Sequence, residues 1–284
     1  MDSATGKTDN LMKQILSDAA DAIRRADAIF ISAGAGMGVD SGLPDFRGNE
    51  GFWRAYPLLR GENLSFQDLA NPSWFSDDPH RAWGFYGHRF NLYKSAVPHQ
   101  GFHILRKWSD SKAIESFVFT SNVDGHFQKL GFSADSVYEC HGSINHLQCN
   151  ECCVNDIWPL EQLDLEIDRG RLLANGELPS CAHCGEVARP NILMFGDGYW
   201  LPKRSGAQSV LFEKWKRANA GTRIVTIEIG AGKDVPTARY ASESMPGRLI
   251  RINPRDSDGT QKTISIPLGA LEALTEIDSL LSIS

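Results

Sequence analysis

The feature that most constrains this chain is a glycine-rich segment that follows a short apolar run near the N-terminus. Residues 28–48 read AIFISAGAGMGVDSGLPDFRG, in which the β-prone run Ile29–Ile31 leads into glycines at Gly34, Gly36 and Gly38. Glycines after a strand let the backbone approach a ligand closely, and the amides that open the following helix suit a phosphate. The segment therefore predicts a nucleotide-binding loop that follows a buried strand.

The loop departs from the usual dinucleotide-binding fingerprint. That fingerprint has its third glycine where Val39 stands, and an acidic residue at the end of a second strand about 20 residues further on. Here the chain continues with Leu43–Gly48, which does not read as a strand. We therefore expect a nucleotide to bind here, but not in the manner of an ordinary dehydrogenase.

Apolar runs and helical periodicities alternate along most of the remaining chain. Amphipathic spacing and composition predict helices at residues 10–25, 80–94, 99–108, 205–219 and 268–281. Short β-prone runs predict strands at residues 28–32, 116–120, 136–140, 191–195, 223–229 and 248–253. Because strands that alternate with helices form a mainly parallel sheet, the expected fold class is α/β, with a Rossmann-like parallel sheet and helices on both faces.

Two segments interrupt this alternation. Residues 49–95 are rich in Trp, Phe and Tyr without a clear strand, and they predict a small helical module. Residues 147–189 carry two cysteine pairs and little apolar periodicity, and they predict an inserted module. The remaining segments then make up one nucleotide-binding domain, which consists of residues 1–48, 96–146 and 190–284.

Composition narrows the class of protein and its partners. The 284 residues are 42% hydrophobic, which argues against a wholly disordered chain, and the formal net charge of −6 gives no reason to expect nucleic acid as a partner. No apolar run approaches the ~18–20 residues of a membrane span, and Met1–Asn10 lacks the apolar core of a signal peptide. We therefore expect a cytoplasmic protein with no membrane partner, whose cysteines stay reduced.

Four of the six cysteines fall into two pairs, Cys149-x2-Cys152 and Cys181-x2-Cys184. Two such pairs match a tetrahedral zinc site with four thiolates, and four cysteine ligands leave no position for a catalytic water. The pattern therefore predicts a structural zinc. The neighbouring Cys153 leaves the choice of ligand open, although its own partner at x2 spacing is an asparagine, which does not bind soft metals.

Polar residues follow several predicted strands at their carboxyl ends, where open parallel sheets bind ligands. In Thr120–Asp124, Asn122 can donate and accept hydrogen bonds and Asp124 can accept them, although such residues are also favoured in turns and helix caps. His141 follows another strand and can act as a general base near neutral pH. Cys140 should face the core instead, because adjacent strand residues point to opposite faces.

Taken together, these motifs resemble the sirtuins, the NAD-dependent protein deacylases. The resemblance rests on the glycine loop with Ser41–Arg47, on Thr120–Asp124, on His141-Gly142, on the cysteine pairs and on Phe195–Asp197. These motifs occur in the family's order from about Leu11 to the C-terminal helix. The resemblance implies an enzyme that cleaves its co-substrate NAD to nicotinamide and transfers the acyl group of an acyl-lysine peptide to ADP-ribose.

The resemblance also implies a role for each matching residue. His141 is implied to be the general base, and Asn122 to hold the nicotinamide ribose and a water. The residues implied to bind NAD are Gly34, Ala35, Gly36, Asp45, Phe46, Arg47, Ser121, Asn122, Asp124, Gly230, Ala231 and Asn253. The peptide is implied to add a strand between the 231–236 loop and Phe195, Gly196 and Asp197. The implied zinc ligands are Cys149, Cys152, Cys181 and Cys184.

Several departures from the family pattern motivate alternatives. Ser121 stands where the family usually has Gln, Gly38 where it has Ser, and Gly230–Gly232 where it has Gly-Thr-Ser. An NAD glycohydrolase or a mono-ADP-ribosyltransferase on the same scaffold is therefore the main alternative, although the zinc pairs and the Phe-Gly-Asp strand favour a peptide substrate. A binding module without catalysis is disfavoured by Asn122 and His141, and a zinc hydrolase by the closed four-cysteine site.

The sequence leaves the acyl chain undefined. Residues of the helical module that can select it are also compatible with ordinary core or surface positions; they are Trp53, Tyr56, Trp83, Tyr86 and Arg89.

Overall fold

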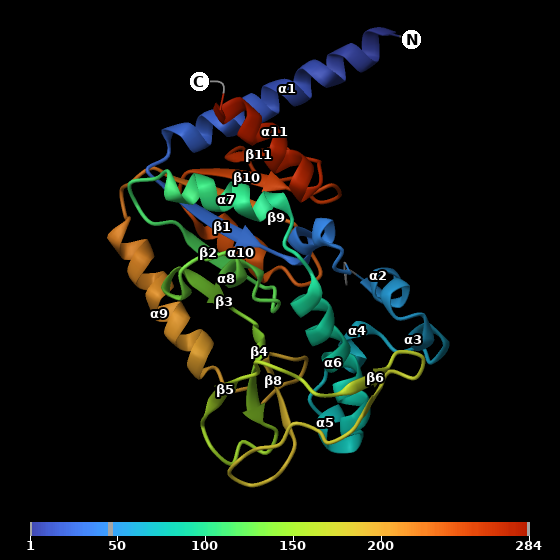
Figure 1. The fold of residues 1–284 in the computed structure, drawn as a ribbon. Coiled ribbons are helices and arrows are strands. Elements are labelled where there is room, and N and C mark those ends of the chain that lie inside the picture. Colours follow the sequence, from blue (N-terminus) through green and yellow to red (C-terminus); the bar gives the residue numbers. More distant parts are fainter. Residues whose placement is uncertain (1, 45–47, 283–284) are drawn as a thin grey trace.

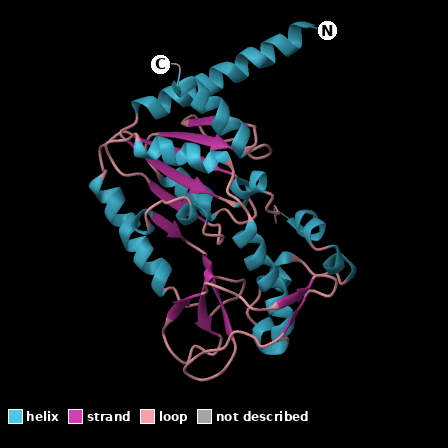
Figure 2. Cartoon of the chain, in the orientation of Figure 1, coloured by secondary structure: helices cyan, strands magenta, loops and turns pink. Residues whose placement is uncertain are grey.

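The computed structural model describes residues 2–44 and 48–282, and its main body is a sheet between two layers of helices (Figure 1, Figure 2). Six strands within the described residues form this sheet in the order β11-β10-β9-β1-β2-β3, and each neighbouring pair is parallel. The strands are β1 (Ala28–Ala33), β2 (Phe117–Thr120), β3 (Val137–Glu139), β9 (Ile224–Ile229), β10 (Arg248–Ile252) and β11 (Thr263–Ile266). The predicted α/β class with a parallel sheet is confirmed.

The register of the central strands brings their carboxyl ends to one level. Ala33, the last residue of β1, lies opposite Thr120 of β2 and Ile229 of β9. All three strands are buried along their whole length, because helices cover both faces of the sheet. The loops that follow these strands therefore start side by side at one edge, as the sequence predicts for a ligand site.

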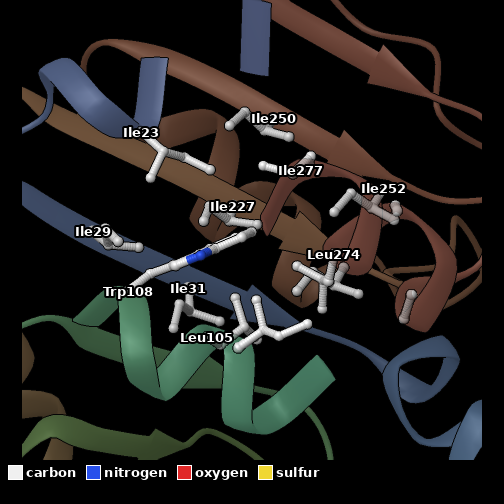
Figure 3. Packing of buried hydrophobic residues seen from close by; sticks show 14 of the residues in the cluster. Ile23, Ile29, Ile31, Leu105, Trp108, Ile227, Ile250, Ile252, Leu274 and Ile277 are labelled. Atoms are coloured by element: carbon white, nitrogen blue, oxygen red, sulfur yellow. The ribbon is translucent and has the colours of Figure 1, made fainter. Parts of the chain in front are cut away.

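One face of the sheet is covered by α1 (Asp2–Arg25), α7 (Gln100–Asp110) and α11 (Ala270–Ser282). Figure 3 shows isoleucines of the central strands packed against Trp108 of α7 and Leu274 of α11. The opposite face is covered by α9 (Lys203–Ala218) and α10 (Thr237–Ser244), where Phe30 stacks on Phe212 with 5.3 Å between ring centroids. The short helices α8 (His126–Lys129) and η2 (Ala134–Ser136) connect β2 to β3.

The two predicted insertions pack against each other below this sheet in Figure 1. The helical module consists of α2 (Gly48–Ala55), α3 (Pro57–Gly61), α4 (Phe66–Leu69), α5 (Trp74–Asp77) and α6 (Pro79–Ser95). The cysteine module contains the antiparallel sheet β5 (Ile157–Pro159), β4 (Gly142–Cys149) and β8 (Ala188–Ile192), and the hairpin β6 (Glu166–Asp168) and β7 (Leu173–Asn175).

The contact between the two modules is close. A Cβ added to Gly84 of α6 would lie 2.1 Å from the carbonyl oxygen of Leu172, so the helix packs directly on the chain that precedes β7. Trp83 of the same helix donates a hydrogen bond to the carbonyl of Ala188 (3.0 Å). The domain boundaries at residues 49–95 and 147–189 stay a prediction, and β4 and β8 run a few residues beyond the second of these ranges.

One predicted strand is misplaced, and five of the described strands were not predicted: β4, β5, β6, β7 and β11. The strand expected at 191–195 lies instead at Ala188–Ile192, and it pairs antiparallel with β4 rather than entering the main sheet. The strand contains Arg189 and Pro190, which are unusual in a fully buried strand, so the sequence does not predict that it starts here. β4 mixes polar and apolar residues, and β11 is a four-residue strand at the sheet edge, so neither shows a clear β pattern.

Local signals explain where the long helix α6 begins. Asp78 accepts a hydrogen bond from the backbone N–H of Arg81, and Pro79 occupies the first position of α6. The predicted helix at 10–25 extends further in the N-terminal direction, to Asp2. Within residues 2–44 and 48–282, no helix combines the length and apolar character needed to cross a membrane.

Candidate active site

A cavity of about 590 Å³ lies at the carboxyl edge of the main sheet, between this sheet and the helical module. Its walls come from the glycine loop, the Ser121–Asp124 segment, His141, helices α4 and α6, and the chain after β8. Of the residues predicted to form the site, those on the cavity wall are Gly34, Ala35, Ser121, Asn122, Asp124, His141 and Phe195. The topology therefore gathers predicted site residues from four separate parts of the chain.

The glycine loop is a 3₁₀ helix, η1 (Ala35–Ser41), that packs directly on the loop after β9. A Cβ added to Gly34 would lie 2.7 Å from Cα of Ala231, and one added to Gly230 would lie 2.4 Å from backbone atoms of Gly36. The N–H of Gly36 donates to the carbonyl of Gly230 (3.0 Å). These glycines are therefore required for contact between two backbone loops, and Gly230 also has a positive φ of 63°.

Asn122 is held across the edge of the sheet to the glycine loop. Its Nδ2 donates to the carbonyl of Gly34 (3.0 Å), and its backbone N–H donates to Oγ1 of Thr120 (3.0 Å). Asp124 accepts from the backbone N–H of His126 (2.9 Å) in the turn that precedes α8, and it also lines the cavity. Asp124 therefore makes a local turn contact and also faces the cavity, and its role in binding stays a prediction.

His141 lines the cavity, and its backbone carbonyl accepts from the N–H of Leu193 (2.9 Å). Burial lowers the pKa of His141 below its ordinary value of 6.5, and a hydrogen bond with the Ser121 backbone offsets part of this effect. The imidazole is therefore neutral at pH 7 and can accept a proton. Cys140 faces the phenylalanine cluster under α9 as predicted, and burial raises its pKa to about 12.

The residues predicted to hold the adenosine half of NAD lie together but away from the cavity wall. Nδ2 of Asn253 donates to the carbonyl of Ala231 (2.9 Å), and its Oδ1 accepts from the backbone N–H of Asp256 (3.0 Å). Asn253 and Ala231 are almost fully buried. Their described contacts join two loops to each other, and Gly36 likewise lies behind the wall.

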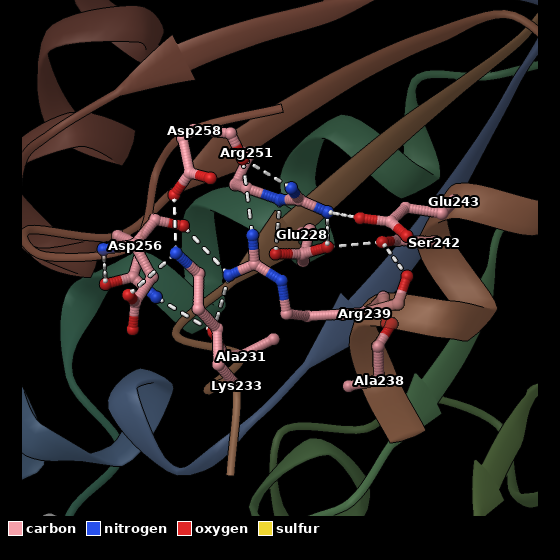
Figure 4. Close-up of polar contacts among 12 residues, drawn as sticks. Glu228, Ala231, Lys233, Ala238, Arg239, Ser242, Glu243, Arg251, Asp256 and Asp258 are labelled. Carbon is pink, nitrogen blue, oxygen red and sulfur yellow. Dashed lines mark hydrogen bonds and ion pairs between the residues drawn. The ribbon is translucent and has the colours of Figure 1, made fainter. Parts of the chain in front are cut away.

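A charged network lies next to these two loops and bonds to the loop after β10 (Figure 4). Arg251 of β10 lies opposite Glu228 of β9 and pairs with it (Nε to Oε1, 2.7 Å), and both side chains are buried. The same guanidinium contacts Glu243 (2.7 Å) and donates to the carbonyl of Asp258 (2.6 Å). Arg239 adds a hydrogen bond to the carbonyl of Asp256 (2.9 Å).

This network was not predicted, although the sequence contains a signal for it. Glu228 and Arg251 are single charges inside the apolar runs IEI and IRI, and their neighbouring strands place them in register. Opposite charges at matching positions of two apolar strands indicate a buried pair, because an unpaired charge there would be very costly.

Helix α6 contributes three polar side chains to the cavity wall. Tyr86, Arg89 and Tyr93 line it, and the guanidinium of Arg89 donates to the hydroxyl of Tyr93 from Nε (3.0 Å) and Nη2 (2.7 Å). Of the five residues considered for acyl selection, Tyr86 and Arg89 are on the described wall. Trp83 is instead buried where the helical module packs against the cysteine module.

Additional wall residues come from α4, which was not expected at the site, and from the 231–236 loop, which the resemblance implied as one side of the peptide site. They are Ser65, Phe66, Gln67 and Ala70 around α4, and Gly232, Asp234 and Val235 after β9. Ser65 and Asp68 form a capping box, which is a recognisable sequence signal for a helix start at this position. The predicted NAD-binding residues Asp45, Phe46 and Arg47 lie outside the described residues.

Only the first residue of the Phe195–Asp197 motif faces the cavity. Asp197 instead forms a bidentate ion pair with Arg189 (2.8 and 2.9 Å), and neither side chain is exposed. The Asp197 carboxylate also accepts from the backbone N–H of Tyr199 (3.2 Å). Asp197 thus fixes the fold of the segment, and Gly196 is absent from the described cavity wall.

The structure corrects one of the four predicted zinc ligands. The sulfurs of Cys149, Cys153, Cys181 and Cys184 all lie within 4.8 Å of one another. Sulfur pairs across this cluster are 3.6 Å (Cys149–Cys184) and 3.5 Å (Cys153–Cys181) apart, close to the roughly 3.8 Å edge of a tetrahedron with zinc–sulfur bonds of about 2.3 Å. The four thiols therefore fit a structural zinc.

Cys152 is excluded from the cluster by its backbone. Its φ of 49° is left-handed, and its thiol donates to the carbonyl of Tyr199 (3.0 Å) instead of facing the other sulfurs. The next residue, Cys153, enters the cluster in its place. A count of residues between cysteines could not show this, because the choice depends on the turn conformation.

Comparisons with known proteins agree with this geometry. The model of the Sir2 family matches residues 34–219. An NAD-dependent protein deacylase of Pyrococcus furiosus is 32% identical over 241 residues, which cover 84% of this chain and 86% of that protein. An NAD-dependent protein deacylase of Deinococcus radiodurans is 30% identical over 273 residues, which cover 93% and 99%. This chain belongs to the Sir2 family.

Solved structures share the fold. The crystal structure of a Sir2 homologue in complex with NAD superposes with a TM-score of 0.68 at 22% identity and covers 94% of each chain. Sir2Tm bound to a propionylated peptide superposes with a TM-score of 0.64 at 19% identity and covers 95% of this chain and 99% of the other.

Proposed function

We propose that this chain is an NAD-dependent protein-lysine deacylase, which cleaves NAD to nicotinamide and transfers the acyl group of a lysine to ADP-ribose. The observation that carries the proposal is one cavity that joins Asn122, a neutral His141 and the glycine loop. Membership of the Sir2 family and the names of the relatives support the same activity.

The wall residues divide the work of this reaction. Bound NAD supplies an electrophilic ribose carbon, and Ala35, Asn122 and Asp124 hold its nicotinamide end. Asn122 can orient a ribose hydroxyl or a water because its amide is already fixed on the carbonyl of Gly34. His141, neutral at pH 7, accepts the proton of a ribose hydroxyl. The surrounding apolar wall excludes water, which favours acyl transfer over hydrolysis.

The peptide lies as an added strand between Phe195 and the loop at 232–235, both of which contribute to the cavity wall. Zinc held by Cys149, Cys153, Cys181 and Cys184 has a structural role, because four thiolates complete its coordination. We place the reaction in the cytoplasm, where such thiols stay reduced.

The acyl group extends toward Arg89 in this proposal. This residue is 6% exposed, lines the cavity and is surrounded by aromatic rings of α6. An acyl chain that ends in a carboxylate gains a charge-assisted hydrogen bond there, whereas a chain that ends in a methyl group does not. We therefore expect acidic acyl groups to be preferred to aliphatic acyl groups of the same length.

The test is incubation with NAD and a panel of acyl-lysine peptides that vary in chain length and terminal charge. The expected result is peptide-dependent release of nicotinamide with formation of O-acyl-ADP-ribose. His141→Ala should abolish both products, whereas His103→Ala, a change at an exposed histidine of α7, should leave them unaltered. Equal nicotinamide release with and without peptide, and no O-acyl-ADP-ribose, would instead identify an NAD glycohydrolase. Label transfer from NAD to protein would identify a mono-ADP-ribosyltransferase.

A further inference from the structure

The chain that follows β8 is attached to the cysteine module by a buried glutamine. Gln148 lies in β4, directly before the metal-site residue Cys149, and is 0% exposed. Its Nε2 donates to the carbonyl of Tyr199 (2.8 Å), and its Oε1 accepts from the backbone N–H of Leu201 (3.0 Å). One side chain therefore satisfies two backbone groups of a segment about 50 residues away in sequence.

A second buried amide reinforces this attachment. Nδ2 of Asn191, in the neighbouring strand β8, donates to Oε1 of Gln148 (2.8 Å) and to the carbonyl of Leu201 (3.0 Å). Asn191 is also 0% exposed. A buried hydrogen-bond network of this kind fixes a single local geometry, since each broken bond leaves a desolvated polar group.

The attached segment is the one that forms the substrate side of the cavity. Leu193, Met194 and Phe195 line the cavity, and the backbone N–H of Phe195 donates to the carbonyl of Ala70 in the helical module (2.9 Å). The segment is thus tethered at its start by β8, and at its end by Gln148. Between these points it forms turns that are held by the Asp197–Arg189 pair and by the bond from Phe195 to Ala70, and Gln148 fixes the part from Tyr199 to Leu201.

We propose that Gln148 is a positioning residue for the acyl-lysine substrate, which fixes the Leu193–Leu201 segment in the conformation that accepts the peptide. This inference rests on the proposed deacylase function. Without Gln148 the segment must be ordered at the moment of binding, and this ordering reduces the affinity for peptide. The glycine loop has no described contact with Gln148, so the affinity for the nucleotide is unaffected.

The experiment compares Gln148→Met with the unchanged protein, using calorimetric titration with an acyl-lysine peptide and, separately, with ADP-ribose. The expected result is a peptide Kd raised roughly tenfold, which is the effect of one or two buried hydrogen bonds, and an ADP-ribose Kd changed by less than about twofold. Amide hydrogen exchange at Leu201 should also become faster, because its acceptor is lost.

Two further variants keep the test decisive. Asn191→Ala disrupts the same network from the other strand and should also weaken peptide binding selectively, which covers the case in which Gln148→Met does not fold. Ile277→Val, in the core under α11, lowers stability without contact with the segment and should leave both affinities unchanged.

The inference is overturned if Gln148→Met and Asn191→Ala leave the peptide Kd unchanged, or if they weaken the binding of peptide and of ADP-ribose equally. It is also overturned if Ile277→Val weakens peptide binding to the same extent. If the unchanged protein binds no acyl-lysine peptide at all, the proposed function fails, and the inference fails with it.

Discussion

The pairing of Glu228 with Arg251 makes a quantitative prediction about stability. Replacement of Arg251 by Met removes a guanidinium that is 1% exposed and leaves the carboxylate of Glu228, which is 0% exposed, without its cation. Breaking one side of a buried ion pair costs about 3–5 kcal/mol, because the remaining charge stays desolvated. The lost bond to the carbonyl of Asp258 adds to this cost, and it loosens the loop that follows β10.

The double variant Glu228→Gln with Arg251→Met separates this effect from simple loss of packing. It removes both charges and keeps most of the side-chain volume, so most of the lost stability should return. A useful control is Arg223→Met, which breaks a pair with Asp27 that is 72% and 35% exposed. An exposed pair of this kind contributes only about 0–1 kcal/mol.

Urea unfolding monitored by circular dichroism measures these differences. With a denaturant slope of about 3 kcal/mol/M, the single variant should unfold at a urea concentration about 1–2 M lower, and the control within about 0.3 M of the unchanged protein. If Arg251→Met matched the control, or if the double variant were no more stable than the single one, the attribution to an uncompensated buried carboxylate would be wrong.

Three further predictions concern the buried His99, the cysteine cluster and the glycine loop. Nδ1 of His99 accepts a hydrogen bond from the N–H of Gly101, and burial lowers the pKa of this imidazole. Below pH 6.5 the unfolded chain therefore binds more protons than the folded chain, and the melting temperature should fall as the pH falls. His99→Asn, which can still cap α7, should make the melting temperature less dependent on pH. Cys153→Ser should lose bound zinc whereas Cys152→Ser should retain it, as measured by the metal content per chain. The opposite result would identify Cys152 as the ligand, as the C-x2-C spacing predicts. Gly34→Ala places a Cβ 2.7 Å from Cα of Ala231 and should raise the Kd for NAD at least tenfold. The control Ser41→Ala removes only the hydroxyl that accepts a hydrogen bond from the backbone N–H of His99, and it should change the Kd less. Equal effects of the two variants would show that the close contact between the loops does not determine NAD affinity.

The sequence predicted the structure correctly where local backbone geometry alone determines the position of a residue. The β1 run and the glycines after it predicted a buried strand and a loop of close backbone approach, and both are present. The polar residues Asn122 and His141 were placed correctly at strand ends, because parallel strands end at one edge of the sheet. Cys140 was correctly assigned to the core by the alternation of strand side chains.

The sequence was a poor guide where tertiary contacts decide the outcome. Asp197 is a carboxylate in a motif that suggested substrate contact, but the buried Arg189 binds it instead. The left-handed turn at Cys152 directs its thiol away from the cysteine cluster, and Cys153 lies in the cluster instead. Strand β8 carries Arg189 and Asn191 in a fully buried position, which only their partners in other segments make possible.

The contact between the glycine loop and the loop after β9 restricts how this active site can diversify. Where Gly34 meets Ala231 and Gly230 meets Gly36, the two loops touch through main-chain atoms, and no side chain is available for exchange. This contact beside the cavity can therefore change only by coordinated replacement in two segments that are about 200 residues apart. Adaptation to new substrates is left to the walls, where α6 and the chain after β8 present side chains that can be replaced one at a time.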